Sequence, residues 1–466
     1  MFRGSWLVGG TRLFGNIMRI WGILEHRRAP AMVAAAAALL AGLFAFAPAH
    51  AQVGAIGGSY APSFQPPPVS TDHPDYLTNP GQPEDALVVG NWLVYPSAFV
   101  GGVYDSNINQ SSTNVQSSGG ARLTPSLLAI SIGDFSKTTI YGVADARIYA
   151  NQQANNADAV DVSSGIIEVY QPLPDLIFTG QGDYTRQKDL FSTLGDTHAV
   201  VNLNPAAIGL APISNPIAYN QLTGSLQVQK NFSNAFLIAT GSVVGQIYDD
   251  NTNINENPNN ATVTGGLRGG IWFTPAIYGY VEGAGDSRNE SVSSLSSSGY
   301  RVTGGLGTDQ LGLVRGEVYG GYQSEGYSAS GIGTVSSSIY GARGYYNPLP
   351  DLTLNVSIDE ELGVSLLTPL PNSPFGSATK ATTALAMANY ALSDFWAAGL
   401  RGGYIRTDYV GTPRRDDAWT AGGTLTYQLM RNIGLTADYQ HTELSSNVAL
   451  QSFSRDVVTV GLTFKY

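Results

Sequence analysis

Residues 140–148 read Ile140-Tyr-Gly-Val-Ala-Asp-Ala-Arg-Ile148, and the two alternating faces of this stretch differ in chemistry. One face carries the charged residues Asp145 and Arg147, whereas the other carries only Ile, Gly and Ala. Because side chains alternate between the two sides of a β-strand, a period of two predicts a strand with one polar and one apolar side. The same alternation recurs at 352–359 and 419–428.

The composition of the 466-residue chain favours a membrane β-barrel over a soluble protein. Only 13% of the residues are charged, against roughly 25% in soluble domains, while Gly reaches 55 and Tyr 25. The mean hydropathy is −0.03, and no run of about 18 apolar residues follows residue 51, which excludes helical membrane spans. In a membrane β-barrel, apolar and polar residues alternate and cancel in the average.

The first 51 residues have the three parts of a secretory signal peptide. An apolar run at 33–47 follows Arg27-Arg28 and precedes Ala49-His50-Ala51, an A-x-A cleavage pattern. We therefore expect residues 1–51 to be removed. A membrane anchor is the alternative, but the run is shorter than the roughly 20 residues that a span needs.

The next segment, 52–85, is rich in Pro, Ser and Gly and lacks an apolar period. It is predicted to be an extended periplasmic tail or a plug inside the barrel, and the sequence does not separate these alternatives. Residues 86–466 are predicted to form the outer-membrane β-barrel.

The connections between the predicted strands fall into two classes that alternate along the chain. Eight short turns are expected at 133–136, 172–175, 231–234, 274–275, 309–312, 348–351, 393–394 and 430–431. Nine longer polar loops are expected at 105–118, 151–160, 188–219, 250–260, 289–298, 326–334, 365–379, 410–416 and 446–453. Short periplasmic turns and long external loops are typical of outer-membrane barrels. Seventeen connections predict about 18 transmembrane antiparallel strands, with 16 to 20 possible.

The last predicted strand alternates from Val458 to Lys465 and ends on Tyr466. A terminal aromatic residue resembles the signal by which the outer-membrane assembly machinery recognises its clients. In lipid, an open sheet edge leaves backbone groups without partners, so we expect this strand to close onto the first one, at about 91–104.

Charged residues inside the predicted strands identify a candidate lumen. A lipid-facing Arg at the bilayer midplane costs about 2–4 kcal/mol, so these side chains are expected to point inward. The pore-lining candidates are Asp145, Arg147, Asp183, Arg268, Glu282, Arg301, Arg315, Glu317, Arg343, Asp359, Glu361, Arg401 and Asp438. Their mixed signs indicate no clear ion preference, and many are expected to form neutralising pairs.

Aromatic residues near the strand ends predict the interfacial girdles of a membrane barrel. They are Tyr104, Trp272, Phe273, Tyr346, Tyr390, Phe395, Trp396, Tyr409 and Tyr427. A sugar track is the alternative, but these residues cluster beside turns and not along one inward ladder.

The sequence gives little support for catalysis or cofactor binding. Cysteine is absent, and the three histidines beyond the leader are too dispersed for a metal cluster, so no metal or cofactor is expected. A hydrolase site of His441 with Asp438 and Glu443 is a weaker alternative. The net charge of −11 becomes −15 without the leader, which argues against nucleic acid as a partner.

The front of the predicted barrel resembles a known family. Tyr95-Pro-Ser97, Gly102-Val-Tyr-Asp-Ser-Asn-Ile108 and Leu123-Thr-Pro-Ser126 are similar to the opening of a β-barrel porin family found in exopolysaccharide gene clusters of proteobacteria. The resemblance implies a role in polysaccharide export across the outer membrane and supplies no catalytic residues.

The expected function is therefore a passive outer-membrane channel that supports exopolysaccharide export. Three alternatives stay open: a plugged structural barrel whose loops bind polysaccharide or protein, an outer-membrane hydrolase, and a secreted soluble all-β protein. The oligomeric state and the solute cannot be inferred from the sequence.

Overall fold

A computed structural model describes residues 86–108, 112–113, 115–150, 159–187, 218–249, 259–291, 296–311, 313–328, 333–349, 351–364, 378–448 and 452–466. The regular structure in these ranges consists of β-strands. None of the described residues form a helix that is long and apolar enough to span a membrane. The predicted leader and tail, 1–51 and 52–85, lie outside the described residues.

The strands follow one another along the chain with similar lengths. They are β1 (Leu87–Val89), β2 (Trp92–Asp105), β3 (Ser118–Ile132), β4 (Ser136–Tyr149), β5 (Ala159–Leu173), β6 (Leu176–Gln187), β7 (Tyr219–Asn231), β8 (Ala235–Tyr248), β9 (Asn260–Trp272), β10 (Ile277–Glu290), β11 (Ser297–Leu311), β12 (Val314–Tyr327), β13 (Thr334–Leu349), β14 (Leu352–Val364), β15 (Ala378–Ala391), β16 (Trp396–Tyr409), β17 (Arg415–Met430), β18 (Ile433–Ser446) and β19 (Phe453–Lys465).

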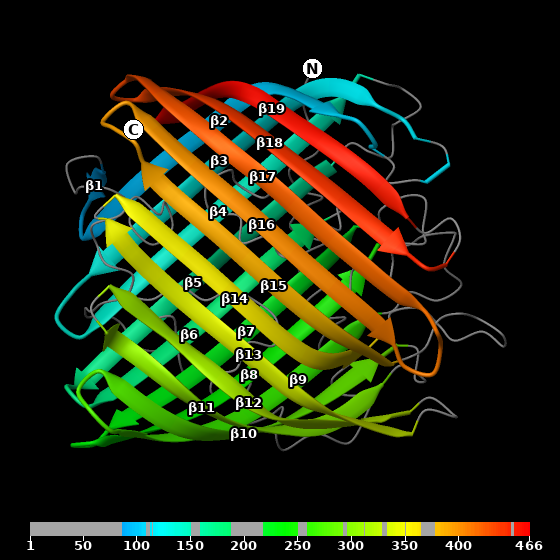
Figure 1. The fold of residues 1–466 in the computed structure, drawn as a ribbon. Coiled ribbons are helices and arrows are strands. Elements are labelled where there is room, and N and C mark those ends of the chain that lie inside the picture. The colour runs from blue at the N-terminus through cyan, green and yellow to red at the C-terminus, as the bar shows by residue number, and fades with distance from the viewer. Residues whose placement is uncertain are drawn as a thin grey trace.

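The sheet closes on itself as an antiparallel barrel of 18 strands (Figure 1). From β2 to β19 each strand pairs with its chain neighbours, and β19 pairs with β2 from Val457↔Asp105 to Lys465↔Ser97. Closure gives every strand two partners, which removes the free edges that lipid does not tolerate. The predicted fold class, strand number and closing pair are confirmed.

One strand was not expected from the sequence. β1 forms a short hairpin with β2 through Gly90 and Asn91, with Val89 opposite Trp92. Gly90 has a φ of 61°, a left-handed conformation that glycine adopts without steric cost. A three-residue strand is too short for its alternation to stand out in a sequence.

The strands are joined by short turns at one end of the barrel and by longer connections at the other. The eight short turns contain two to four residues, and the nine longer connections contain five to 31. Each short turn coincides with one expected from the sequence. Figure 1 shows the short turns together at the left-hand end.

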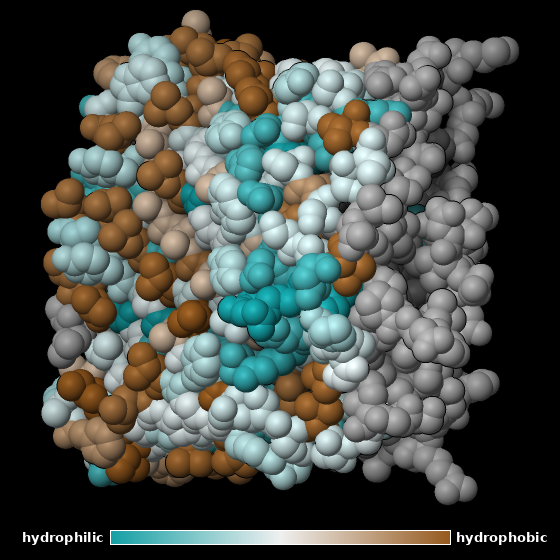
Figure 2. Space-filling view, turned by 45° about the vertical axis from the view of Figure 1, so that its right-hand side comes forward, coloured by the Kyte–Doolittle hydropathy of each residue, from teal (hydrophilic) through white to brown (hydrophobic). Residues whose placement is uncertain are grey.

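The outer face carries exposed aliphatic and aromatic side chains, such as Val100, Leu267 and Leu400. Figure 2 shows this apolar surface and a strip of hydrophilic side chains towards the end with the longer connections. Seven of the nine predicted girdle residues lie on the outer face or in short turns. The prediction is wrong for Trp272 and Tyr409, which share the inner face with Arg268 and Arg401 by strand parity.

Aromatic rings on the inner face lie against glycines of the neighbouring strand. The direct cross-strand pairs are Tyr141–Gly165, Phe236–Gly270, Tyr278–Gly307, Tyr280–Gly305 and Tyr319–Gly341. A Cβ at any of these glycines would come within 3 Å of the ring opposite. The rings therefore lie along the wall, in space that only glycine leaves free.

Candidate pore lining

All thirteen pore-lining candidates lie on one face of the barrel wall. Strand alternation places each of them opposite the exposed aliphatic face: Asp145, Arg147, Asp183, Arg268, Glu282, Arg301, Arg315, Glu317, Arg343, Asp359, Glu361, Arg401 and Asp438. This inner face combines seven carboxylates with six arginines among the candidates. The structure joins most of them in two clusters of ion pairs and two separate pairs.

The first cluster runs across β3, β4 and β5. Arg122 Nε donates to Asp145 Oδ1 at 2.7 Å, and the other oxygen of Asp145 lies 3.3 Å from Arg147 Nε. Arg147 in turn pairs with Asp161 on β5. Thr124 also donates its hydroxyl to Asp145, at 2.8 Å. The charges alternate in sign, so the cluster is neutral and is held against the wall.

The second cluster spans β9 to β12 and contains four of the candidates. Arg268 bridges Glu282 at 2.7 Å and Glu317 at 3.1 Å. Arg301 lies 3.7 Å from the second carboxylate oxygen of Glu282. The guanidinium of Arg268 also lies 4.0 Å from the ring centroid of Tyr280, a cation–π contact. One arginine therefore connects three strands, β9, β10 and β12.

Two further arginines of the inner face bond to single carboxylates. Arg343 Nη2 lies 3.0 Å from Asp359 Oδ1, which also accepts the Tyr319 hydroxyl at 2.7 Å. Arg401 forms a two-point pair with Asp438, at 2.7 and 2.8 Å. Two parallel hydrogen bonds fix the guanidinium plane as well as its position.

Asp183 lies apart from these clusters. Its carboxylate accepts hydrogen bonds from Tyr141 and from Gln181, the latter at 2.5 Å. It therefore contributes a negative charge that neutral donors stabilise.

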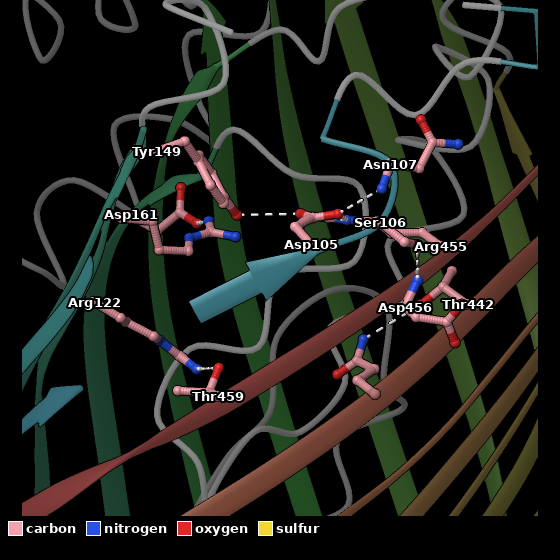
Figure 3. A network of polar contacts seen from close by, with 12 residues as sticks. Asp105, Ser106, Asn107, Arg122, Tyr149, Asp161, Thr442, Arg455, Asp456 and Thr459 are labelled. Atoms are coloured by element: carbon pink, nitrogen blue, oxygen red, sulfur yellow. Dashed lines mark hydrogen bonds and ion pairs between the residues drawn. The ribbon is translucent and has the colours of Figure 1, made fainter. Parts of the chain in front are cut away.

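The seam between β2 and β19 carries a polar network that sequence reasoning missed (Figure 3). Asp105 accepts hydrogen bonds from Arg455 Nε, at 2.9 and 3.1 Å, and from Arg455 Nη2, at 2.5 Å. It also accepts from the Tyr149 hydroxyl at 3.1 Å. Arg122 reaches from β3 across β2 to Thr459 Oγ1 on β19, at 3.3 Å. These side chains reinforce the backbone pairs that close the barrel.

The Asp-Ser-Asn-Ile stretch that begins at Asp105 anchors the first longer connection to this seam. The backbone N–H of Asn107 donates to Asp105 at 3.0 Å, and the Asn107 side chain donates to the Ser454 carbonyl at 2.9 Å. Ile108 is buried against Val103 and Tyr149. The Asp105–Ile108 stretch, which carries the family resemblance, therefore also has a structural role.

For one of these missed residues, Arg122, the sequence contains a signal that could have identified it. Arg122 stands in mid-strand between Ala121 and Leu123, so the rule that selected the other candidates would have selected it too. Asp105 falls within the connection predicted at 105–118, and Asp161 directly follows the one predicted at 151–160, whereas β2 and β5 include both residues. Their inward orientation depends on how far the strands extend, which alternation alone does not decide.

The structure does not assemble the hydrolase site suggested around His441. Asp438 lies on the inner face with Arg401, whereas His441 and Glu443 lie on the outer face. His441 Nδ1 instead lies 2.8 Å from Asp456 Oδ1, and its ring packs against Trp419 in a tilted arrangement with centroids 4.7 Å apart. Among the described residues, no group of three or more His, Asp or Glu side chains is arranged to hold a metal ion.

Residues 84–466 match the model of a family described as "Putative beta-barrel porin 2". The chain belongs to this porin family. The match begins just before β1 and covers every strand of the barrel, so the porin is an outer-membrane protein embedded in a lipid bilayer. Porin families are typically non-enzymatic. No curated protein matches the porin at a significant level.

Solved outer-membrane proteins resemble the porin only distantly. OccAB4 of Acinetobacter baumannii is 11% identical, with a TM-score of 0.40 and coverage of 80% of this chain and 98% of that one. An anion-selective porin from Comamonas acidovorans is 12% identical, with a TM-score of 0.34 and coverage of 80% and 99%. The siderophore receptor PirA of Pseudomonas aeruginosa is 9% identical, with a TM-score of 0.36 and 80% coverage of both chains.

Proposed function

We propose that the porin is a passive channel for hydrophilic solutes. The observation that supports this most is the closed 18-stranded wall with a charged, hydrogen-bonded inner face. Barrels of 16 to 18 strands generally leave an aqueous passage. The ion pairs and the rings that lie on glycine keep bulky side chains along the wall. Selection would then depend on the width and the wall charges, without a covalent step.

The test is the conductance of the detergent-folded protein, without its leader, in a planar bilayer. Steady conductance steps are expected, once the shift in gel mobility on heating has verified a folded barrel. A folded barrel that never conducts would contradict the proposal and favour the plugged scaffold whose loops bind polysaccharide or protein.

We further propose that the cargo is an exopolysaccharide on its way out of the cell. The resemblance of the Asp105–Ile108 stretch to porins of exopolysaccharide gene clusters supports this cargo. The near balance of seven carboxylates and six arginines among the candidates also suits it, because opposite charges that pair on the wall leave few free charges to trap or repel a sugar polymer.

The cargo is tested by adding neutral polysaccharide fragments to one side of the conducting bilayer. Polysaccharide is expected to block the current in discrete events, longer than those from polyethylene glycol of the same hydrodynamic radius. Equal block times for the two polymers would contradict a preference for sugar and leave the channel as an unselective porin.

A further inference from the structure

Two adjacent strands of the wall, β7 and β8, carry no charged side chain on the inner faces that the structure describes (Figure 1). Thr223 of β7 pairs in register with Asp183 of the inner face, so every second residue of β7 from there points inward. We call these residues, with three of β8, the neutral column: Gln221, Thr223, Ser225, Gln227, Gln229, Asn231, Thr240, Ser242 and Gln246. On either side of it the inner face is charged, with Asp183 on β6 and Arg268 on β9.

Hydrogen bonds within the wall orient the amides at the upper end of the neutral column. Asn260 Nδ2 on β9 donates to Gln246 Oε1 at 3.0 Å, and Gln246 Nε2 donates to Gln221 Oε1 at 2.8 Å. Gln221 Nε2 donates in turn to Thr223 Oγ1 at 3.3 Å. A carboxamide has two N–H donors and an oxygen with two lone pairs. Gln221, which is only half-buried, therefore keeps one donor and one lone pair for a solute.

The middle of the neutral column is free to bind. Ser225 and Gln227 are half-buried, and neither side chain has a hydrogen-bond partner among the described residues. Gln227 lies opposite Thr240 of β8, and Ser225 lies opposite Ser242. Hydroxyl and amide groups of two strands are thus presented together to the interior, without a charge between them.

An aromatic cluster lies at the short-turn end of the neutral column. Phe236 pairs in register with Asn231, the last residue of the column. Its ring lies 5.5 Å from that of Tyr278 and 6.3 Å from that of Trp272, measured between centroids. Trp272 is half-buried on the inner face. The face of an aromatic ring is electron-rich, so it packs favourably against the C–H bonds of a sugar ring.

We propose that the neutral column binds an uncharged sugar chain along the wall, with Trp272 as the stacking platform at the short-turn end. This rests on the proposed channel function, since the lumen must admit the chain. Sugar hydroxyls donate and accept hydrogen bonds, as the amides and hydroxyls of the column do. An ionised sugar would lose hydration there without gaining a counter-charge. The column extends about 34 Å along β7, long enough for several sugar units to bind at once.

The experiment titrates the detergent-folded full barrel with maltohexaose, an uncharged glucose hexamer, and follows tryptophan fluorescence. The detergent has no sugar headgroup, so it does not compete. A saturable change is expected, and Trp272→Phe should abolish it, because the other tryptophans of the described strands lie on the outer face: Trp92, Trp396 and Trp419. Hexagalacturonate, an anionic sugar chain of the same length, is expected to bind more weakly.

Gln227→Met keeps the length of the side chain but removes its hydrogen-bonding groups. It is expected to weaken binding roughly 2- to 10-fold, the usual effect of one hydrogen bond. Thr240→Val keeps the side-chain shape and should act in the same direction. Thr383→Val is the matched control, because it makes the same change on β15, where Thr383 is half-buried on the inner face opposite Asp359. The control should leave the affinity unchanged.

Three results would overturn the proposal: no saturable binding to the unmodified barrel, equal or tighter binding of the anionic hexamer, or equal weakening by Thr240→Val and Thr383→Val. The titration needs no bilayer, so its outcome is separate from that of the conductance test. Sugar binding to a folded barrel that never conducts would contradict the channel alone, and a conducting barrel that binds no sugar would contradict the neutral column alone.

Discussion

At the scale of single residues, the inner wall contains arginines that hold a carboxylate in a fixed geometry. Arg401 and Asp438 show this most simply, since both side chains are almost fully buried and two hydrogen bonds join them. Thr424 also donates to Asp438, at 2.6 Å. Removal of one partner leaves the other buried without its counter-charge, which is costlier than removal of both.

We therefore expect Arg401→Ala to lower the free energy of unfolding by about 2–3 kcal/mol. The double variant Arg401→Ala/Asp438→Ala should be less destabilised than the sum of the single variants, because the orphaned carboxylate is gone. Urea unfolding followed by gel mobility measures these differences. Arg406→Ala on the outer face is the control, with an expected change within about 0.5 kcal/mol. Additive effects of the two inner-wall substitutions would contradict the coupling.

A second prediction concerns the turn between β5 and β6, outside the membrane span. Lys230 Nζ lies 2.5 Å from Asp175 Oδ2, and this hydrogen bond lowers the pKa of Asp175 below its ordinary value. A carboxylate with a lowered folded-state pKa stabilises the fold above its unfolded-state pKa, and the contribution disappears as the pH falls through the folded-state pKa. The pair is exposed, so the effect is small.

Asp175→Asn should accordingly be slightly less stable than the unmodified protein at pH 6, and the difference should disappear as the pH falls below the ordinary pKa of an aspartate, about 3.9. Unfolding midpoints measured at half-unit intervals of pH would reveal this convergence. A stability difference that persists at low pH would indicate that the amide disturbs the turn by itself.

At the scale of elements, the pairing of β12 with β13 depends on a ring that occupies the place of a missing side chain. Tyr319 lies over Gly341, where a Cβ would come 2.4 Å from the ring and its hydroxyl oxygen. The same hydroxyl donates to Asp359 on β14. The glycine therefore lets one tyrosine connect three adjacent strands.

We expect Gly341→Ala to displace the Tyr319 ring and to destabilise the barrel by about 1–3 kcal/mol, the usual cost of overpacking. Gly283→Ala on β10 is the matched control, because it faces outward and a Cβ there meets no atom within 4 Å. Thermal or urea unfolding compares the two. Equal stability of the two variants would show that the ring is free to move aside.

The strands themselves were predictable because apolar and polar residues alternate along each of them, according to whether a side chain faces the lipid or the interior. Residues 140–148 alternate between apolar and polar faces as lipid and the interior require, and the turns at 133–136 and 172–175 contain residues that favour tight bends. The sequence did not predict β1, whose three residues give too short a pattern, nor the inward orientation of Trp272 and Tyr409. Aromatic residues occur both at the membrane interface and in the packed inner wall, so the residue type alone does not show whether the side chain faces outward or inward.

At the scale of the whole molecule, the outer face grades from aliphatic to aromatic to charged side chains along the strands. On β16 the order is Leu400, Tyr404, Arg406 and Asp408, towards the end with longer connections. Trp396 and Tyr404 are eight residues apart on the same face, about 27 Å along a strand. At a tilt of about 40° this becomes roughly 20 Å, close to the roughly 25 Å apolar band of such barrels.

Leu400 is 66% exposed between the two aromatic levels and is therefore expected to face the lipid midplane. Leu400→Arg should destabilise the lipid-embedded barrel by about 2–4 kcal/mol, whereas Tyr404→Arg, at the outer level, should cost about 0–1 kcal/mol. Reversible unfolding from lipid vesicles measures both. A larger penalty at Tyr404 would place the bilayer at a different height on the barrel.

The sequence by itself determined the fold class, the approximate number of barrel strands, the alternating turn lengths and the face on which mid-strand charges lie. All of these follow from local pattern, because a strand between lipid and an interior of different polarity must alternate along its own residues. Only the tertiary structure decided which charges meet. Arg268 with Glu317, Asp286 with Glu325 and Arg455 with Asp105 come together across strands, and the last pair is separated by 350 residues. Such contacts depend on the register and closure of the whole barrel, and the sequence of a single strand specifies neither.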